Sequence, residues 1–274
     1  MIARTLRVAA DAAERAVLIL SELSPAGFEE RESEGCADFV VYGTADDLPE
    51  QSALRRALGP SLLWIQDAEI PDDWSERWKT WHQPVWVEVD GRRALVRPPW
   101  EQPAADADTL ELVIDPGQAF GTGGHDTTRL CLELLLGRPA GGSLADWGCG
   151  TGVLALAAAR LGWTPVTAID FDSAAVEATK TNAEANGIGG LTIERLDLTV
   201  QPGPLADLVV ANLILPLLLQ VAAGMRQAPP VLIASGLLRQ QVDEACAAFA
   251  PLGLRETTRS ESREWAAVVL EKRS

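Results

Sequence analysis

The fold of this chain is decided by the stretch Leu144-Ala145-Asp146-Trp147-Gly148-Cys149-Gly150-Thr151-Gly152. It starts as an apolar strand, continues into an acid and three glycines at alternate positions, and leads into a helix predicted over Val153–Leu161. Glycines at such a turn let a ligand lie against the backbone, beside a helix N-terminus. The next predicted strand ends at Asp170, twenty residues after Gly150, where a carboxylate can accept hydrogen bonds from a ribose. We therefore expect a nucleoside-binding turn rather than a glycine-rich turn without a ligand.

The glycine spacing separates two kinds of nucleotide site. A dinucleotide site has the pattern G-x-G-x-x-G, which would require glycine where this chain has Val153. The form Asp-x-Gly-x-Gly-x-Gly resembles instead the first motif of class I methyltransferases that bind S-adenosylmethionine (SAM), which contains a nucleoside but no pyrophosphate. The resemblance implies SAM as the cofactor, with Asp146, Gly148, Gly150 and Asp170 in its binding site.

Strands and helices alternate from Leu110 onward, which predicts an α/β fold with a parallel sheet covered on both faces. The last two strands leave no room for a helix between them, so we expect the final strand to be antiparallel. With an antiparallel last strand, such a sheet resembles the Rossmann-like sheet of class I methyltransferases. The predicted strands are Leu110–Asp115, Leu144–Trp147, Val166–Asp170, Leu191–Leu196, Leu208–Ala211, Val231–Ala234, Gly253–Thr258 and Trp265–Glu271.

The N-terminal part predicts a separate, smaller domain. Between residues 3 and 67 the order strand, helix, two strands, helix and strand is the ferredoxin-like α+β arrangement. A tryptophan-rich connector follows, in which a helix with Trp74, Trp78 and Trp81 on one face precedes a hairpin. That face could be an aromatic wall against a substrate or a hinge packed on the second domain, but an ordinary packed face of the connector is the favoured interpretation, because large aromatic side chains at helical spacing are more often buried. We divide the chain into a ferredoxin-like substrate-recognition domain (1–69), the connector (70–109) and a SAM-binding methyltransferase domain (110–274).

Charge and composition limit the partners of this protein. The net charge is −16, and residues 1–70 contain thirteen acidic and six basic side chains. An acidic surface repels phosphate backbones, so nucleic acid is not expected as the main target, whereas a basic protein would be attracted. Solubility alone would also explain the charge. Four widely spaced cysteines, two histidines and no long apolar run argue for a cytoplasmic protein with reduced thiols, no metal site and no membrane segment.

Two further stretches carry a more specific signal. The first is Asp115-Pro-Gly-Gln-Ala-Phe-Gly-Thr-Gly-Gly-His125-Asp-Thr-Thr-Arg129, a glycine-rich loop that leads into a helix. The second is Ala206-Asp-Leu-Val-Val-Ala-Asn212, a strand that ends in an amide side chain. With the glycine turn and Asp170, they resemble the ribosomal protein L11 methyltransferase family. The pattern D-P-G-x-A-F-G-T-G-x-H-x-T-T is the specific part, because the glycine turn alone indicates only SAM binding.

The resemblance implies a SAM-dependent lysine methyltransferase, with N-terminal amines as further acceptors. Its substrate would be a basic protein of the large ribosomal subunit, held by the N-terminal domain. Two departures from the family pattern bear on the target: Asp126 stands in place of a proline, and Leu213-Ile214-Leu215 in place of Ile-Leu-Ala. The SAM contacts of the family fall on Thr127, Gly148, Asp170 and Asn212.

Methyl transfer to a lysine needs an amine that has lost its proton and is aligned with the methyl group. His125 is a candidate proton acceptor, although ordering its own loop by hydrogen bonding is the simpler role. Phe120 could face the sulfonium or a methylated ammonium, or could pack beneath the loop. We therefore expect positioning to be the main catalytic contribution. Two other functions stay open: methylation of another protein or a small molecule, and a non-catalytic module for SAM sensing or ribosome assembly.

Overall fold

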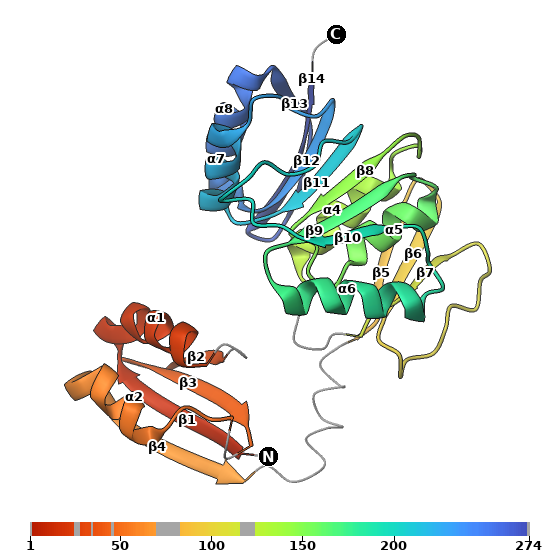
Figure 1. The fold of residues 1–274 in the computed structure, drawn as a ribbon. Helices are drawn as coiled ribbons and strands as arrows, with labels where there is room; N and C mark the ends of the chain where they lie inside the picture. The colour runs from red at the N-terminus through yellow and green to blue at the C-terminus, as the bar shows by residue number, and fades with distance from the viewer. Residues whose placement is uncertain are drawn as a thin grey trace. The chain divides into compact units, whose positions relative to one another are not determined.

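The computed structural model divides the chain into two compact units, residues 1–81 and 82–274 (Figure 1). Each unit has a hydrophobic core of its own. No helix among the described residues is long and apolar enough to cross a membrane. The predicted connector helix with Trp74, Trp78 and Trp81 lies outside the described residues, and so does Phe120. The structure describes residues 2–24, 28–33, 35–44, 47–69, 83–115 and 124–272.

The first unit has the predicted ferredoxin-like order of strands and helices. Its strands form an antiparallel sheet in the order β2-β3-β1-β4, with both helices packed on one face (Figure 1). Successive strand residues point to opposite faces, so Leu6, Val8 and Phe39 are buried beside Leu20 and Leu54 of the helices. The elements are β1 (Ile2–Ala9), α1 (Ala13–Leu23), β2 (Glu29–Ser33), β3 (Cys36–Gly43), α2 (Gln51–Leu58) and β4 (Leu62–Glu69).

The second unit is built on a seven-stranded sheet in the order β10-β9-β8-β11-β12-β14-β13. The first five of these strands are parallel to one another, whereas β14 runs antiparallel to both β12 and β13. The expected α/β sheet with an antiparallel final strand is thus confirmed. The strands are β8 (Leu144–Trp147), β9 (Val166–Asp170), β10 (Thr192–Arg195), β11 (Leu208–Asn212), β12 (Val231–Leu238), β13 (Leu254–Ser262) and β14 (Trp265–Lys272).

Helices cover both faces of this sheet, as the alternation of elements predicted. One core cluster contains apolar residues of α4 and α5, and a second cluster contains those of α7 and α8 (Figure 1). Because both faces are covered, all four residues of β8 are buried, the acid Asp146 included. The helices are α4 (Asp126–Leu136), α5 (Val153–Leu161), α6 (Ser173–Ala185), α7 (Leu215–Gly224) and α8 (Val242–Phe249).

One predicted strand belongs to a different sheet. We expected Leu110–Asp115 in the parallel sheet, but β7 (Leu110–Val113) pairs in parallel with β6 (Arg92–Arg97) in a three-stranded sheet completed by β5 (Val85–Val89). The charged Glu111 offers a physical reason, because its carboxylate pairs with Arg97 of β6 at 2.6 Å, while Leu112 is buried on the other side of the strand. The hairpin that we placed in the connector is therefore part of the second unit.

Candidate active site

The predicted cofactor-binding residues lie at or near the carboxyl edge of the sheet, where the strand order reverses. From β8 the chain continues to β9 on one side, and β11 is the neighbour of β8 on the other side. In open α/β sheets, ligands bind outside the carboxyl ends of the strands at such a point. Asp170 ends β9, Asn212 ends β11, and the glycine turn follows β8 directly. The topology therefore brings together segments that are far apart in the sequence.

The turn after β8 needs its glycines for conformation and for space. Gly148, Gly150 and Gly152 have φ angles of +77°, +54° and +83°, which residues other than glycine rarely adopt. A Cβ atom on Gly148 would lie 2.5 Å from Cδ2 of Leu213, and one on Gly152 would lie 2.6 Å from Cγ2 of Thr179. Packing alone thus demands glycine at position 152, where the branched Thr179 side chain is close with three of its atoms, whereas at position 148 the flexible end of Leu213 can turn aside. The presence of these glycines is compatible with a ligand but does not require one.

Asp170 holds the glycine turn against the end of β9. Its carboxylate accepts a hydrogen bond from the Gly150 amide at 3.0 Å and another from the Asp172 amide at 3.0 Å. The residue is 9% exposed, so it meets solvent at the edge of the sheet. A carboxylate has about four acceptor positions, and these two bonds leave others for ligand hydroxyls. The proposed ribose acceptor is therefore well placed, but it also shapes the turn.

Asp146 lies beneath the same turn and is completely buried. Its Oδ2 atom accepts a hydrogen bond from the Ala155 amide, in the first turn of α5, at 3.1 Å. No hydrogen-bond partner of its Oδ1 atom is found among the described residues. Burial, together with the nearby charge of Asp170, raises the pKa of Asp146 to about 7, against the effect of the Ala155 bond. The carboxyl group thus binds the first turn of a helix, and its other oxygen has no partner in the part of the chain that the structure describes.

The start of α4 adjoins the ends of β11 and β12. His125 caps this helix, because its Nδ1 atom accepts from the Thr127 amide at 3.3 Å and lies 2.8 Å from the Thr127 hydroxyl. The Ser235 hydroxyl of β12 donates to the Thr127 carbonyl, and the Asn212 amide group donates to the Thr128 hydroxyl at 3.2 Å. The predicted Thr127 and Asn212 therefore both lie where the start of α4 meets the ends of β11 and β12, although the hydrogen bond of Asn212 is with the adjacent Thr128.

The chain matches the family model "Ribosomal protein L11 methyltransferase (PrmA)" over residues 57–273. It belongs to that family. A ribosomal protein L11 methyltransferase of Synechococcus is 39% identical over 244 residues, which cover 82% of this chain and 79% of that protein. One of Pelotomaculum thermopropionicum is 41% identical over 216 residues, covering 77% and 69%. The crystal structure of a ribosomal protein L11 methylase from Lactobacillus delbrueckii subsp. bulgaricus is similar with a TM-score of 0.57 and 27% identity, over 69% of this chain and 99% of that one.

Asp126, which stands where the L11 methyltransferase family pattern has a proline, lies at the start of α4. The residue lies beside a hollow of about 450 Å³ that is also lined by Trp86, His125 and Trp265. The rings of His125 and Trp265 meet edge to face, with centroids 4.9 Å apart. The carboxylate of Asp126 pairs with Arg129 at 3.5 Å and faces Arg263 at 3.8 Å. The additional acid is thus neutralised by arginines of the same unit.

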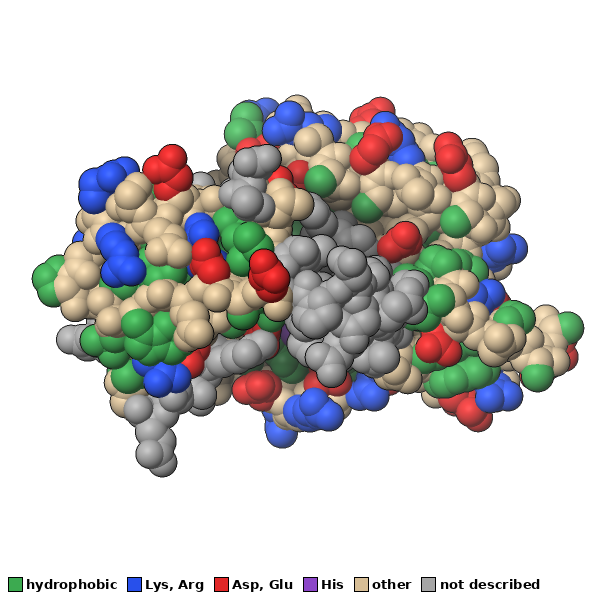
Figure 2. Space-filling view, turned by 90° about the horizontal axis from the view of Figure 1, so that it is seen from below, with side chains coloured by type: hydrophobic (Ala, Val, Ile, Leu, Met, Phe, Trp, Pro, Cys, Tyr) green, Lys and Arg blue, Asp and Glu red, His purple; other side chains and the backbone are tan. Residues whose placement is uncertain are grey.

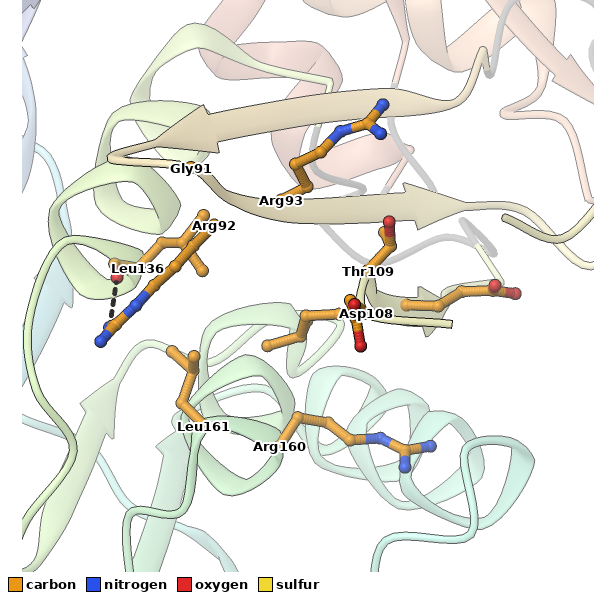
Figure 3. Close-up of a pocket in the computed structure, with 10 residues that line it drawn as sticks. Gly91, Arg92, Arg93, Asp108, Thr109, Leu136, Arg160 and Leu161 are labelled. Atoms are coloured by element: carbon orange, nitrogen blue, oxygen red, sulfur yellow. Dashed lines mark hydrogen bonds between the residues drawn. The ribbon is translucent and has the colours of Figure 1, made fainter. Parts of the chain in front are cut away.

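A larger hollow, of about 640 Å³, lies at the C-terminal ends of α4 and α5, away from the glycine turn (Figure 3). Three arginines line it, but the guanidinium groups of Arg92, Arg93 and Arg160 point away from one another. Arg92 donates to the Leu136 carbonyl at 3.1 Å and Arg160 to the Asn186 carbonyl at 2.6 Å, which satisfies helix ends. Guanidinium groups used in this way do not converge on an anion, so we place the active site at the glycine turn.

The sequence analysis missed the residues of α6 that bind the backbone of the glycine turn. Thr179 and Asn182 of α6 are buried and donate hydrogen bonds to the carbonyls of Gly150 and Thr151. Ser235, which contacts Thr127, was also missed. The available signal was weak: a polar residue in a predicted helix is ordinarily assigned to the solvent face, and only the packing shows that these are inside.

The raised pKa of Asp146 predicts an unusual pH dependence of stability. Between the ordinary pKa of 3.8 and about 7, the folded protein keeps a proton that the unfolded chain releases. The free energy of unfolding therefore falls as the pH rises through this range, by at most ~1.4 kcal/mol per pH unit. Asp146→Asn removes the titration. Denaturant titrations without ligand at several pH values should show the variant gaining stability relative to the wild type up to about pH 7.

Asp207→Asn is the matched control. Hydrogen bonds from Ser143 lower the pKa of this exposed carboxylate below its ordinary value of 3.8. The contribution of Asp207 to the free energy of unfolding is therefore lost only as the pH falls below about that value. The stability difference between this variant and the wild type should stay constant from about pH 5 to pH 8. A constant difference for Asp146→Asn as well would show that Asp146 does not titrate there.

Proposed function

We propose that this chain transfers methyl groups from SAM to amines of ribosomal protein L11, chiefly lysine side chains. Its relatives are ribosomal protein L11 methyltransferases, which indicates the substrate, and the carboxyl edge of the sheet offers a site for the cofactor. The observation that carries the proposal is the junction of the glycine turn with Asp170 and Asn212 at the strand-order reversal. In this arrangement backbone, carboxylate and amide groups face one ligand region.

The residues present fit SAM. The glycine turn offers backbone without side chains, Asp170 has acceptor positions for ribose hydroxyls, and Asp146 has a buried oxygen without a protein partner among the described residues. When bound, SAM supplies an activated methyl group on a sulfonium. We assign ribose binding to Asp170, backbone contacts to Gly148 and Gly150, and further polar contacts to Thr127 and Asn212.

The acceptor amine has to be uncharged when it attacks the methyl group. A free lysine has a pKa of about 10.4, and removal from water lowers this value, so a closed site promotes loss of the proton without a strong base. The Nδ1 atom of His125 is engaged in capping α4, which favours the ordering role for this residue over that of a proton acceptor. Alignment of amine and methyl group is then the main contribution of the protein.

The first unit is the part of the chain suited to bind a basic protein. Thirteen acidic and six basic side chains lie within residues 1–70. Two of the basic residues are already paired, Arg4 with Asp67 at 2.7 Å and Arg7 with Asp38 at 2.5 Å. On the face that Figure 2 shows, acidic and basic side chains of the described residues are interspersed. We therefore assign attraction of the substrate to the net charge of this unit.

Transfer of label from tritiated SAM tests the activity. Ribosomes from a strain that lacks this protein are incubated with the purified chain, and labelled proteins are separated and identified by mass spectrometry. The expected result is label on lysines of L11. Label on another protein or on a small molecule would change the assigned substrate, and SAM binding without transfer to any acceptor would favour the non-catalytic module.

Asp170→Ala is expected to weaken SAM binding by about 10- to 150-fold, because hydrogen bonds to a charged group contribute roughly 1.5–3 kcal/mol. Isothermal calorimetry measures the change. Asp172→Ala is the control, since Asp172 caps α6 by accepting from the Ala174 amide at 2.8 Å and lies two residues away. The control should lose stability but little SAM affinity. Equal SAM affinity in Asp170→Ala and the wild type would refute the ribose assignment.

Removal of residues 1–70 should separate cofactor binding from substrate binding. The two units have separate cores, and the site residues all belong to the second. We expect the truncated protein to bind SAM with nearly unchanged affinity and to lose methylation of L11. Calorimetry and the tritium assay measure the two properties on the same preparation. A truncated protein that methylates L11 at the rate of the intact chain would place substrate recognition elsewhere.

A further inference from the structure

One face of α6 carries a row of buried polar side chains. Thr179, Asn182 and Asn186 follow one another at helical spacing and are 0%, 1% and 8% exposed. Buried amides and hydroxyls are costly unless they are hydrogen-bonded. An apolar residue at each position would have packed without that requirement. The row is therefore of interest for the groups it binds, which include backbone groups of two other segments.

The first segment is the glycine turn. The Thr179 hydroxyl donates to the Gly150 carbonyl at 2.9 Å, and the Asn182 side-chain amide donates to the Thr151 carbonyl at 2.9 Å. The missing side chain of Gly152 lets α6 approach this closely, because a Cβ there would collide with Thr179. Carbonyl groups of the turn are thus held on the side of α6, which sets the direction of the peptide planes between the glycines.

The second segment is the end of β7. The side-chain oxygen Oδ1 of Asn182 accepts a hydrogen bond from the Asp115 backbone amide at 3.0 Å. Asn186 exchanges two hydrogen bonds with Val113, donating to its carbonyl at 2.6 Å and accepting from its amide at 2.8 Å. Since β7 is an edge strand of its small sheet, Asn186 takes the place of a neighbouring strand. Asn182 alone of these side chains contacts both segments.

The start of α6 is tied to the proposed ribose acceptor. Asp172 caps the helix and donates its own amide to the Asp170 carboxylate at 3.0 Å. One continuous helix of thirteen residues therefore connects Asp170, the glycine turn and the end of β7. Any shift between the turn and β7 has to break the bonds of Asn182.

We infer that Asn182 is a positioning residue of the methyltransferase site, which holds the glycine turn in register with the end of β7 and thereby sets its affinity for SAM. This inference rests on the function proposed above. Without the Asn182 side chain, the Thr151 carbonyl and the Asp115 amide both lose a partner inside the protein. The peptide planes of the turn can then rotate toward other hydrogen-bond partners. After such a rotation, the backbone amide and carbonyl groups of the turn no longer face the ligand in the same way.

Asn182→Ala and Asn186→Ala form a matched pair for the test. Both remove a buried asparagine of the same helix that binds the backbone of β7, but only Asn182 binds the turn. Thermal melts should show losses of similar size. Calorimetry should show SAM binding about 10-fold weaker in Asn182→Ala and changed less than about 3-fold in Asn186→Ala. Kinetics should show a raised KM for SAM in Asn182→Ala, with the KM for L11 and the kcat at saturating SAM nearly unchanged.

The outcomes separate the inference from the proposed function. If the wild type does not bind SAM, the proposed function fails. If the wild type binds SAM and both variants lose affinity equally, or neither does, the function stands and Asn182 is a structural residue only. If either alanine variant does not fold, Asn182→Ser and Asn186→Ser take their place, because serine is too short to join the two segments yet leaves a polar group in the interior. The same comparison of affinities then decides.

Discussion

The hydrogen bond between the Gly150 amide and the Asp170 carboxylate is the contact on which the rest of the site depends. It joins the turn after β8 to the end of β9, two strands that are neighbours in the sheet. The bond requires a left-handed backbone at Gly150, with φ of +54°, so that the amide turns toward β9. It also fixes where α6 begins, because the same carboxylate accepts from Asp172. Turn, strand end and helix start therefore have one common anchor.

This anchor has an electrostatic cost. Asp146 and Asp170 are both buried near one turn, and the charge of Asp170 contributes to the raised pKa of Asp146. Amides at the starts of α5 and α6 offset part of this cost. A positively charged ligand would offset more of it. SAM carries both a sulfonium and an ammonium group, so the electrostatics of the turn agree with the cofactor that the proposed function requires.

Residues of the site also serve as helix caps. His125 caps α4, Asp146 binds the first turn of α5, and Asp172 caps α6, so three helices begin at the edge of the sheet where the ligand is expected. The positive ends of these helices add to the attraction for acceptor groups. A consequence is that substitutions at this edge change stability and binding together. Roles can be assigned only by comparing each variant with one that disturbs the same helix without touching the site.

The sequence by itself determined the elements whose signals are local. The strand, glycine turn and helix around Gly148–Gly152, the acid that ends β9, and the succession of strands and helices along both units were predictable, because periodicity and turn chemistry act over a few residues. The motif around His125 also indicated the family. The antiparallel final strand followed from the lack of room for a helix between β13 and β14.

Only the tertiary structure decided the contacts between distant segments. The pairing of β7 with β6, the inward-facing row of α6 that contains Asn182, the neutralisation of Asp126 by Arg263 and the capping role of His125 each depend on how separate elements pack. The polar residues involved look like surface residues in the sequence. Whether such a side chain faces water or a distant backbone amide is determined by the assembled core, and no local pattern carries that information.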